Sequence, residues 1–441
     1  MHSKKKIIKI DYFNYLILGS FLSYIFGFFL YEDSGGGGFN DFIYHAWPII
    51  KSFKDDFLFT LTNFKSFTNA TFPFYHIVIS FIPSFIIKNF FFIRFFNFIL
   101  NIFIVILFYF FLKKKFSNVN KKILILLSST LFLSPYFRMG AFWVMPETFT
   151  FFFFIPACYY FYIIFYNNKT NILANNIFLA IFSSLTLYSR QQYIFLPLIH
   201  FIYLLFYNKN VKTIVLIGLL YLIFSLPGFY TLHLWGTFSD YRSVHALNYV
   251  SYQYILKNLF VILSIIFFYS VPLLFINYQY LKRELINKLF IFRFIILFFV
   301  LSFFIFNIEY SNLGGGVFLK FSQIFLNKNY ILLAFLSSFV ILLLFNVFKK
   351  KEILLFCFII FFIFNLAITE IVFQEWFDPF YIVCFFLIYK KSFIKNIITE
   401  SNLAVNVLYI FQITFLLFCI YFYHFVRVPF FKSHNYLLYL N

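Results

Sequence analysis

Charged residues are scarce in this sequence. They make up 11% of its 441 residues, whereas hydrophobic residues make up 63%, a balance outside that of soluble globular domains. Apolar runs of roughly 20 residues, the length that crosses a bilayer as a helix, recur from end to end. The composition predicts an all-α polytopic membrane protein and excludes a soluble one.

Cysteine is also rare, and other common signals are missing. All four cysteines lie inside apolar runs, which argues against a disulfide framework and a thiolate metal site. No segment matches a nucleotide-binding glycine loop. No small-residue cleavage site follows Lys4–Lys6 and its apolar run, so we expect an uncleaved first span. We detect no internal repeat and predict a single domain over 1–441.

Hydropathy predicts thirteen membrane spans, with the N-terminus in the cytoplasm and the C-terminus outside. They lie at about Tyr12–Leu30, Phe90–Leu112, Ile123–Phe137, Thr148–Phe165, Ile172–Leu187, Tyr193–Phe206, Thr213–Phe229, Leu256–Ile276, Leu289–Phe306, Ile331–Phe345, Ile353–Val372, Phe377–Tyr389 and Leu403–Phe422. This threading places the lysine clusters, including Lys113–Lys115 and Lys349–Lys351, on the cytoplasmic side. The net charge of +20 therefore follows the positive-inside rule and indicates no nucleic-acid partner.

The acidic residues crowd on the outer side of this threading, which favours an activity there. The first outer loop, 31–89, should hold interfacial helices, one of them over Phe72–Ile87. Apolar residues recur at helical spacing over Asp41–Phe53. Asp41 and His45, at i and i+4, would share one face of that helix. The alternative is that Asp41 is merely a helix N-cap, since Asp is favoured there.

Three motifs occur in order: Asp41-Phe-Ile-Tyr-His45, Thr68-Asn-Ala-Thr-Phe-Pro-Phe-Tyr75 and Arg190-Gln191-Gln-Tyr-Ile194. Together they resemble the polyprenyl-phosphate-sugar-dependent glycosyltransferases of the GT-C fold, closest to the dolichyl-phosphate-glucose α-1,2-glucosyltransferases. The chain departs from that family where Phe42 replaces a second acid and where Thr71-Phe72-Pro73 replaces a Pro-Pro pair.

The resemblance implies transfer of a hexose from a polyprenyl phosphate to a lipid-linked or cell-envelope glycan, among membrane lipids. Such transfer needs a base for the acceptor hydroxyl and cations for the departing phosphate. Asp41 is the first candidate for the base and Asp33 the second, while His45 would orient the base or bind the acceptor. For the phosphate we expect Arg190 with Gln191, and less strongly Lys320, because Arg forms bidentate contacts with phosphate.

Further substrate contacts are expected from seven residues: Glu32, Thr71, Pro73, Tyr75, Glu147, Gln374 and Glu375. Several have plainer interpretations. Arg190 could snorkel at a helix end, Glu147 could act only as an acid in a first helical turn, and Gln374 and Glu375 could pack the outer face. The sequence identifies no certain cofactor, and metal binding stays open, since Glu32, Asp33 and Asp41 could offer oxygen ligands to a divalent cation.

The main alternative function is a flippase or transporter of lipid-linked glycans. Such a protein should place ionisable residues near the bilayer midplane, whereas here the predicted span interiors carry almost no charge. An accessory subunit is a second alternative. Compositional bias and compact loops favour a bacterial cytoplasmic membrane, with the site facing outward, over the endoplasmic reticulum.

Overall fold

The structure is a computed structural model, and it describes residues 2–67, 71–83, 86, 89–166, 172–207, 210–235, 252–276, 287–305, 310, 314–344, 353–369, 371–388 and 402–426. This described part is helical throughout, with one isolated β-bridge between Gly315 and Phe373 and no strand. The predicted all-α class is confirmed.

A helix occurs at each predicted span. These helices are α1 (His2–Phe29), α7 (Phe90–Lys115), α8 (Lys121–Ser129) followed by α9 (Pro135–Phe142), α10 (Pro146–Tyr166), α11 (Ile172–Ser189), α12 (Phe195–Tyr207), α13 (Val211–Trp235), α15 (Tyr252–Ile276), α17 (Lys288–Ile305), α19 (Ile331–Leu343), α21 (Ile353–Ala367), α22 (Asp378–Leu387) and α24 (Asn402–Tyr421). Seven of the described helices are long and apolar enough to cross a membrane, or eight if the bent α8–α9 pair is one span. The protein is therefore a multi-pass integral membrane protein.

The span predicted over Ile123–Phe137 is a bent pair of helices and not one continuous helix. Helix α8 passes through a short 3-10 segment, Thr130–Leu133, and α9 then leaves at 68°. The break lies at Ser134, because a residue before proline avoids helical backbone, and its φ of −72° and ψ of 117° are extended. All eight residues of α9 are buried, so this short helix is a wedge inside the molecule.

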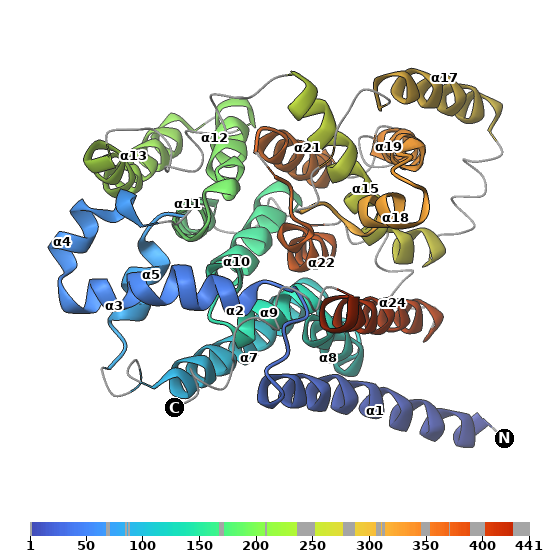
Figure 1. Cartoon of the computed structure of the whole chain (residues 1–441), viewed down its shortest axis with the longest axis horizontal. Coiled ribbons are helices and arrows are strands. Elements are labelled where there is room, and N and C mark those ends of the chain that lie inside the picture. Colours follow the sequence, from blue (N-terminus) through green and yellow to red (C-terminus); the bar gives the residue numbers. More distant parts are fainter. Residues whose placement is uncertain are drawn as a thin grey trace.

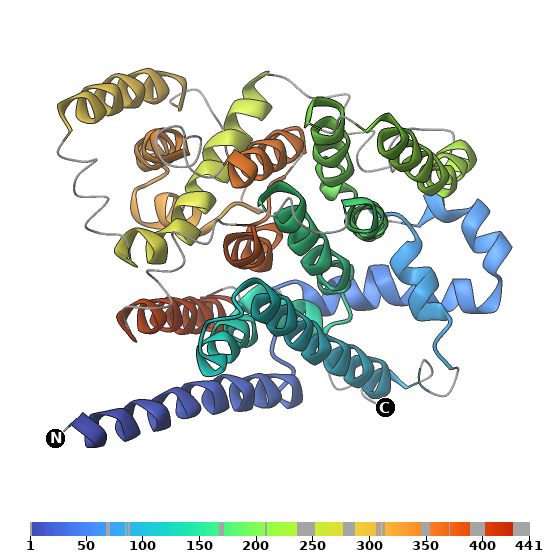
Figure 2. The same cartoon turned by 180° about the vertical axis from the view of Figure 1, so that it is seen from behind.

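The first outer loop is helical, as predicted. A continuous helix consists of α2 (Gly38–Asn40), the π-helix η1 (Asp41–Ala46) and α3 (Trp47–Asp55). Helices α4 (Phe57–Thr62) and α5 (Phe74–Ser80) lie beside α3 at one side of the molecule, far from α17 (Figures 1 and 2). The predicted apolar face is confirmed, since Phe42, Ala46, Ile50 and Phe53 are buried.

Helices α9 and α22 lie in the middle of the fold, with α7, α10 and α24 around them (Figure 1). Every residue of α22 is buried. One cluster of buried apolar side chains extends from Tyr24 in α1 to Cys419 in α24. Ends of α9, α10 and α24, together with nearby loops, form walls of a cavity.

Candidate functional site

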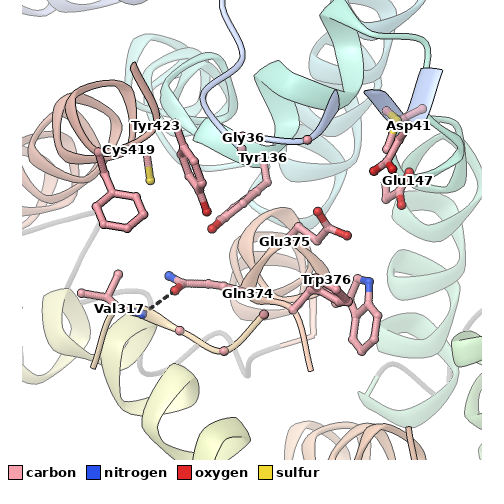
Figure 3. A pocket seen from close by; sticks show the side chains of 18 of the residues that line it. Gly36, Asp41, Tyr136, Glu147, Val317, Gln374, Glu375, Trp376, Cys419 and Tyr423 are labelled. Carbon is pink, nitrogen blue, oxygen red and sulfur yellow. Dashed lines mark hydrogen bonds between the residues drawn. The ribbon is translucent and has the colours of Figure 1, made fainter. Parts of the chain in front are cut away.

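A cavity of about 510 Å³ lies where nine separate stretches of the chain meet (Figure 3). Its lining comes from the glycine loop before α2, from η1, from the segment that holds Thr71 and His76, from the start of α9, from the N-terminal end of α10, from the turn after α11, from the loop 314–316 with α18 (Val317–Phe325), from the turn before α22 and from the end of α24. The lining residues that carry polar or aromatic groups include Asp41, His45, Thr71, His76, Tyr136, Glu147, Arg190, Lys320, Gln374, Glu375, Trp376 and Tyr423.

Asp41 and His45 both line this cavity, as the i and i+4 spacing predicted. The interpretation of Asp41 as an N-cap is wrong, because the helix begins at Gly38 and Asp41 has helical backbone, φ −63° and ψ −36°. The segment that carries both residues is a π-helix, a rare conformation that is frequent at functional sites. Thr68, Asn69 and Ala70 of the second motif lie outside the described residues.

Arg190 forms an ion pair with Glu147, and each side chain is only 13% exposed. Burial lowers the pKa of the Arg190 guanidinium, while the carboxylates of Glu375 and Asp41 act in the opposite direction. Arg190 therefore lies within the cavity wall among three acids and does not snorkel toward lipid headgroups. Glu147 follows Pro146 in the first turn of α10, so it also occupies the position of an ordinary first-turn acid.

Among the acids that line the cavity, Glu375 has the most clearly shifted pKa. It lies in a 3-10 turn, Gln374–Trp376, directly before α22. Its pKa is raised to about 7, first by burial and then by the nearby Asp41 carboxylate, and Arg190 partly offsets the shift. Figure 3 shows Glu375 between the end of the cavity that holds Asp41 and Glu147 and the end that holds Tyr136 and Tyr423.

Gln374 joins two walls of the cavity. Its side-chain oxygen accepts a hydrogen bond from the Val317 backbone N–H at 2.9 Å, and its side-chain nitrogen donates to the Tyr269 hydroxyl at 3.3 Å. The Gly315 N–H also donates to the Val372 carbonyl at 2.7 Å. These bonds fix the glycine loop 314–316 against the turn that carries Glu375.

Lys320 and Gln191 were both predicted to bind phosphate, but the structure places them differently. Lys320 lines the cavity from the same face of α18 as Val317 and Ile324, and it donates to Gln323 at 3.3 Å. Gln191 begins a short 3-10 segment beside Arg190, and it is not part of the cavity lining.

The second candidate base, Asp33, holds the glycine loop in place. Its carboxylate accepts hydrogen bonds from the backbone N–H groups of Gly36, Gly37, Gly38 and Phe39, at 3.1 to 3.3 Å. Burial raises the pKa of Asp33, and these four hydrogen bonds oppose that change. Since its carboxylate is directed at the backbone and does not line the cavity, we assign Asp33 a structural role.

Glu32 also has a structural partner. Its two carboxylate oxygens accept from the Arg138 guanidinium of α9, and both side chains are buried. With Glu32 and Asp33 so engaged, the predicted oxygen ligands do not converge. Within the described residues, no group of three or more His, Cys, Asp or Glu side chains is arranged to hold a metal ion. A divalent cation therefore remains a prediction without a ligand set.

Tyr75 and Pro73 support the site from behind. The Tyr75 hydroxyl donates to the Val144 carbonyl at 2.5 Å, and Tyr75 is fully buried. Val144 has a φ of 56°, a strained conformation for a β-branched residue. Pro73 precedes the first residue of α5. Neither Tyr75 nor Pro73 lines the cavity, whereas Thr71 of the same motif does.

Three polar or aromatic residues of the cavity were missed in the sequence: His76, Tyr136 and Tyr423. His76 directly follows the second motif and could have been found there. Burial lowers its pKa to about 3, so its ring is neutral at physiological pH. The other two are tyrosines in a chain that holds 34 of them, so nothing local distinguishes them.

No known protein family, curated protein or solved structure matches this chain. The functional argument therefore depends on the geometry of the cavity and on the motifs that line it.

Proposed function

We propose that this protein is an integral-membrane hexosyltransferase that uses a polyprenyl-phosphate-linked sugar as donor and a lipid-linked or cell-envelope glycan as acceptor. The observation that supports it best is the convergence of Asp41, Arg190, Lys320 and Glu375, from four distant segments, on one cavity in a membrane protein. Charged groups gathered in one partly enclosed space are typical of a site for polar chemistry.

In the proposed reaction, Asp41 accepts the proton of the acceptor hydroxyl as its oxygen attacks the anomeric carbon. The new carbon–oxygen bond forms while the bond from that carbon to the phosphate oxygen breaks, and polyprenyl phosphate leaves with the bonding electrons. The proton then passes from Asp41 to water or to the released phosphate. Attack opposite the leaving group inverts the anomeric centre. His45, on the same face of η1, would bind the acceptor or orient the base.

Inversion requires the base and the phosphate to lie on opposite sides of the sugar. The charge of Arg190 interacts with the Asp41 carboxylate, so Arg190 lies at the base end of the site, and it is already paired with Glu147. Arg190 is therefore a poor ligand for the leaving group. Lys320 lies on α18, whose Val317 marks the other end of the cavity in Figure 3. Its neighbours in the lining include the apolar Ile324, Phe418 and Phe422. A cation among apolar groups suits a phosphate that carries an isoprenoid chain, so we propose Lys320 as the phosphate ligand.

The shared cavity supports the thirteen-span topology. A segment that begins and ends beside one cavity must cross the membrane an even number of times. Between Asp41 and Glu147 lie the long helix α7 and the bent α8–α9 pair, so the pair has to cross if α7 does. By the same reasoning α11 crosses if α10 does, and α22 crosses if α24 does. Between Arg190 and the loop 314–316 lie three long helices, α13, α15 and α17, so α12 has to cross as well to make the number even. Helices α19 and α21 then cross together or not at all, which gives thirteen or eleven spans.

The side of the membrane on which the cavity opens is part of the proposal. The lysine-rich segments on the opposite side favour the non-cytoplasmic face, and we propose a bacterial cytoplasmic membrane. The alternative activity, movement of an intact lipid-linked glycan across the bilayer, is distinguished by the assay that follows.

The test is transfer by purified protein in liposomes, with radiolabelled polyprenyl-phosphate hexoses and membrane glycolipids as acceptors. We expect Asp41→Asn to reduce turnover by about 10² to 10⁴-fold, the usual contribution of a general base. Asp56→Asn is the matched control, because Asp56 is exposed and caps α4, a role that Asn also fills. Unchanged turnover in Asp41→Asn would remove the base assignment. A donor that crosses the vesicle membrane chemically intact would favour the flippase.

A further inference from the structure

The end of the cavity away from Asp41 is lined by phenols. Figure 3 shows the hydroxyl groups of Tyr136 and Tyr423 directed toward the same point, with the side chain of Gln374 across from them. Tyr136 belongs to the buried wedge α9, and Tyr423 belongs to the π-helix η7 (Phe422–Val426) that continues α24. This aromatic and amide-lined region, which we call the phenol pocket, has no part in the proton transfer described above.

Several features hold the phenol pocket in place. Gly36, with a φ of +75°, lies against the Tyr423 ring, and a Cβ atom at that position would be 1.9 Å from Tyr423 Cδ1. A glycine is therefore required for Tyr423 to approach the loop that Asp33 holds. The backbone N–H of Tyr136 donates to Asp378 at 3.2 Å. The two hydrogen bonds to Val317 and Tyr269 orient the amide of Gln374.

The two π-helical segments of the site point to the same conclusion. Segments 41–46 and 422–426 both border this cavity, one at each end. Isolated π-helical turns are costly and tend to be retained at functional sites. The proposed role of Asp41 as the base explains the π-helical turn 41–46. The π-helical turn that carries Tyr423 has no role in that proton transfer.

The chemistry of the phenol pocket matches a sugar ring. A pyranose has a flat apolar face of C–H groups and a rim of hydroxyl groups. Tyrosine offers the complementary combination of a ring face and a hydroxyl that donates and accepts, and a primary amide adds both functions. The cavity volume of about 510 Å³ is within the roughly 300–1,000 Å³ that is usual for small-molecule sites.

We propose that Tyr136, Tyr423 and Gln374 bind the hexose ring of the donor and select it by the configuration of its hydroxyl groups. This inference rests on the proposed transferase function. In-line displacement then requires the reacting carbon of that sugar to lie between the phosphate ligand Lys320 and the base Asp41. The polyprenyl chain then leaves along the apolar residues beside Lys320, and the acceptor reaches the sugar from the Asp41 end.

The experiment compares kcat/KM for polyprenyl-phosphate glucose, galactose and mannose in Tyr423→Phe and Tyr136→Phe. A hydrogen bond to a sugar hydroxyl is worth about tenfold, so each substitution should lower kcat/KM about tenfold for the preferred sugar and much less for the others. The preference among sugars should therefore shrink while the KM for the acceptor stays unchanged. Tyr421→Phe is the control, since Tyr421 is on the same helix and 60% exposed. An unchanged preference, or equal losses for all three sugars, would overturn the inference.

A second measurement separates this inference from the proposed function. If wild-type protein transfers none of the three hexoses, the transferase proposal fails, and binding then tests the phenol pocket directly. Tryptophan fluorescence would compare a short-chain polyprenyl phosphate with its hexosyl derivatives, using Trp376 in the cavity wall as the reporter. Tighter binding of one hexosyl derivative, lost in Tyr423→Phe but kept in Tyr421→Phe, would support a sugar site. Equal affinities with and without the sugar would overturn it.

Discussion

At the scale of single residues, the ionisation of Glu375 should make the stability of the protein depend on pH. Its folded-state pKa of about 7 exceeds the roughly 4.3 expected in an unfolded chain, so the folded protein holds an extra proton between these values. The stability that this proton contributes is complete below about pH 4.3 and is lost as the pH rises to about 7. Glu375→Gln should remove that loss, making the variant less sensitive to pH than wild type.

Thermal unfolding in detergent at pH 5, 6, 7 and 8 measures this effect. The wild-type midpoint should fall over this range more than the Glu375→Gln midpoint does. Asp55→Asn is the control, because Asp55 is an exposed carboxylate on α3 and lies outside the cavity. Parallel pH profiles for wild type and Glu375→Gln would show that Glu375 is already ionised at pH 5.

Tyr75 lies behind the cavity, and its hydroxyl group should matter for folding. Tyr75→Phe leaves the buried carbonyl of the strained Val144 without its donor, so we expect a loss of about 1–3 kcal/mol in stability. Tyr24→Phe is a close control, since the Tyr24 hydroxyl is equally buried but has no hydrogen-bond partner among the described residues. Equal unfolding midpoints for the two variants would contradict a structural role for the Tyr75 hydroxyl.

Sequence alone predicted the charged half of the site better than the aromatic half. Asp41, Glu147, Arg190 and Glu375 stand out because an acid or an arginine at the edge of an apolar run is rare. Their roles were harder to predict. Asp33 was predicted as the second candidate base and Tyr75 as a substrate contact. Both instead form hydrogen bonds with backbone groups. Tyr136 and Tyr423 could not be distinguished among 34 tyrosines.

At the scale of elements, the wedge α9 depends on one buried ion pair. Arg138 donates to both oxygens of Glu32 and also to the carbonyls of Ser23 and Phe132, so it fastens α9 to α1 and to the first loop. Removing one partner of a buried pair leaves an uncompensated charge. We therefore expect Arg138→Met to cost about 3–5 kcal/mol.

A second substitution tests whether the stability lost in Arg138→Met can be recovered. Combining Glu32→Met with Arg138→Met removes both charges and should recover part of the stability. Unfolding midpoints and monodispersity in detergent are measured for Arg138→Met, for Glu32→Met and for the double variant. Arg293→Met, at an exposed position on α17, controls for the loss of an arginine as such. If the double variant is as unstable as the sum of the single ones, the backbone contacts of Arg138 outweigh its pairing with Glu32.

Hydropathy predicted where the helices lie but not their local shape. Apolar runs and charge clusters can be located directly in the sequence, and a helix occurs at each span predicted from them. The π-helical turn at 41–46 and the 68° break at Ser134 depend on packing between distant elements. Pro135 is visible in the sequence, but the hydropathy prediction of a span over Ile123–Phe137 took no account of it.

At the scale of the whole molecule, the proposals require the first outer loop and the loop carrying Lys320 to lie on one side of the membrane, with the lysine-rich turns on the other. In a cysteine-free background, exposed reporter positions are Ser66 and Lys328 for the outer side and Lys113 and Lys212 for the inner side. A membrane-impermeant maleimide applied to sealed, right-side-out vesicles should label cysteines at 66 and 328 and spare those at 113 and 212. Permeabilised vesicles, in which all four should react, are the control. Labelling of 66 and 113 from the same side would mean that α7 does not cross. Labelling of 66 and 328 from opposite sides would separate Asp41 from Lys320, and then no single sugar phosphate could reach both.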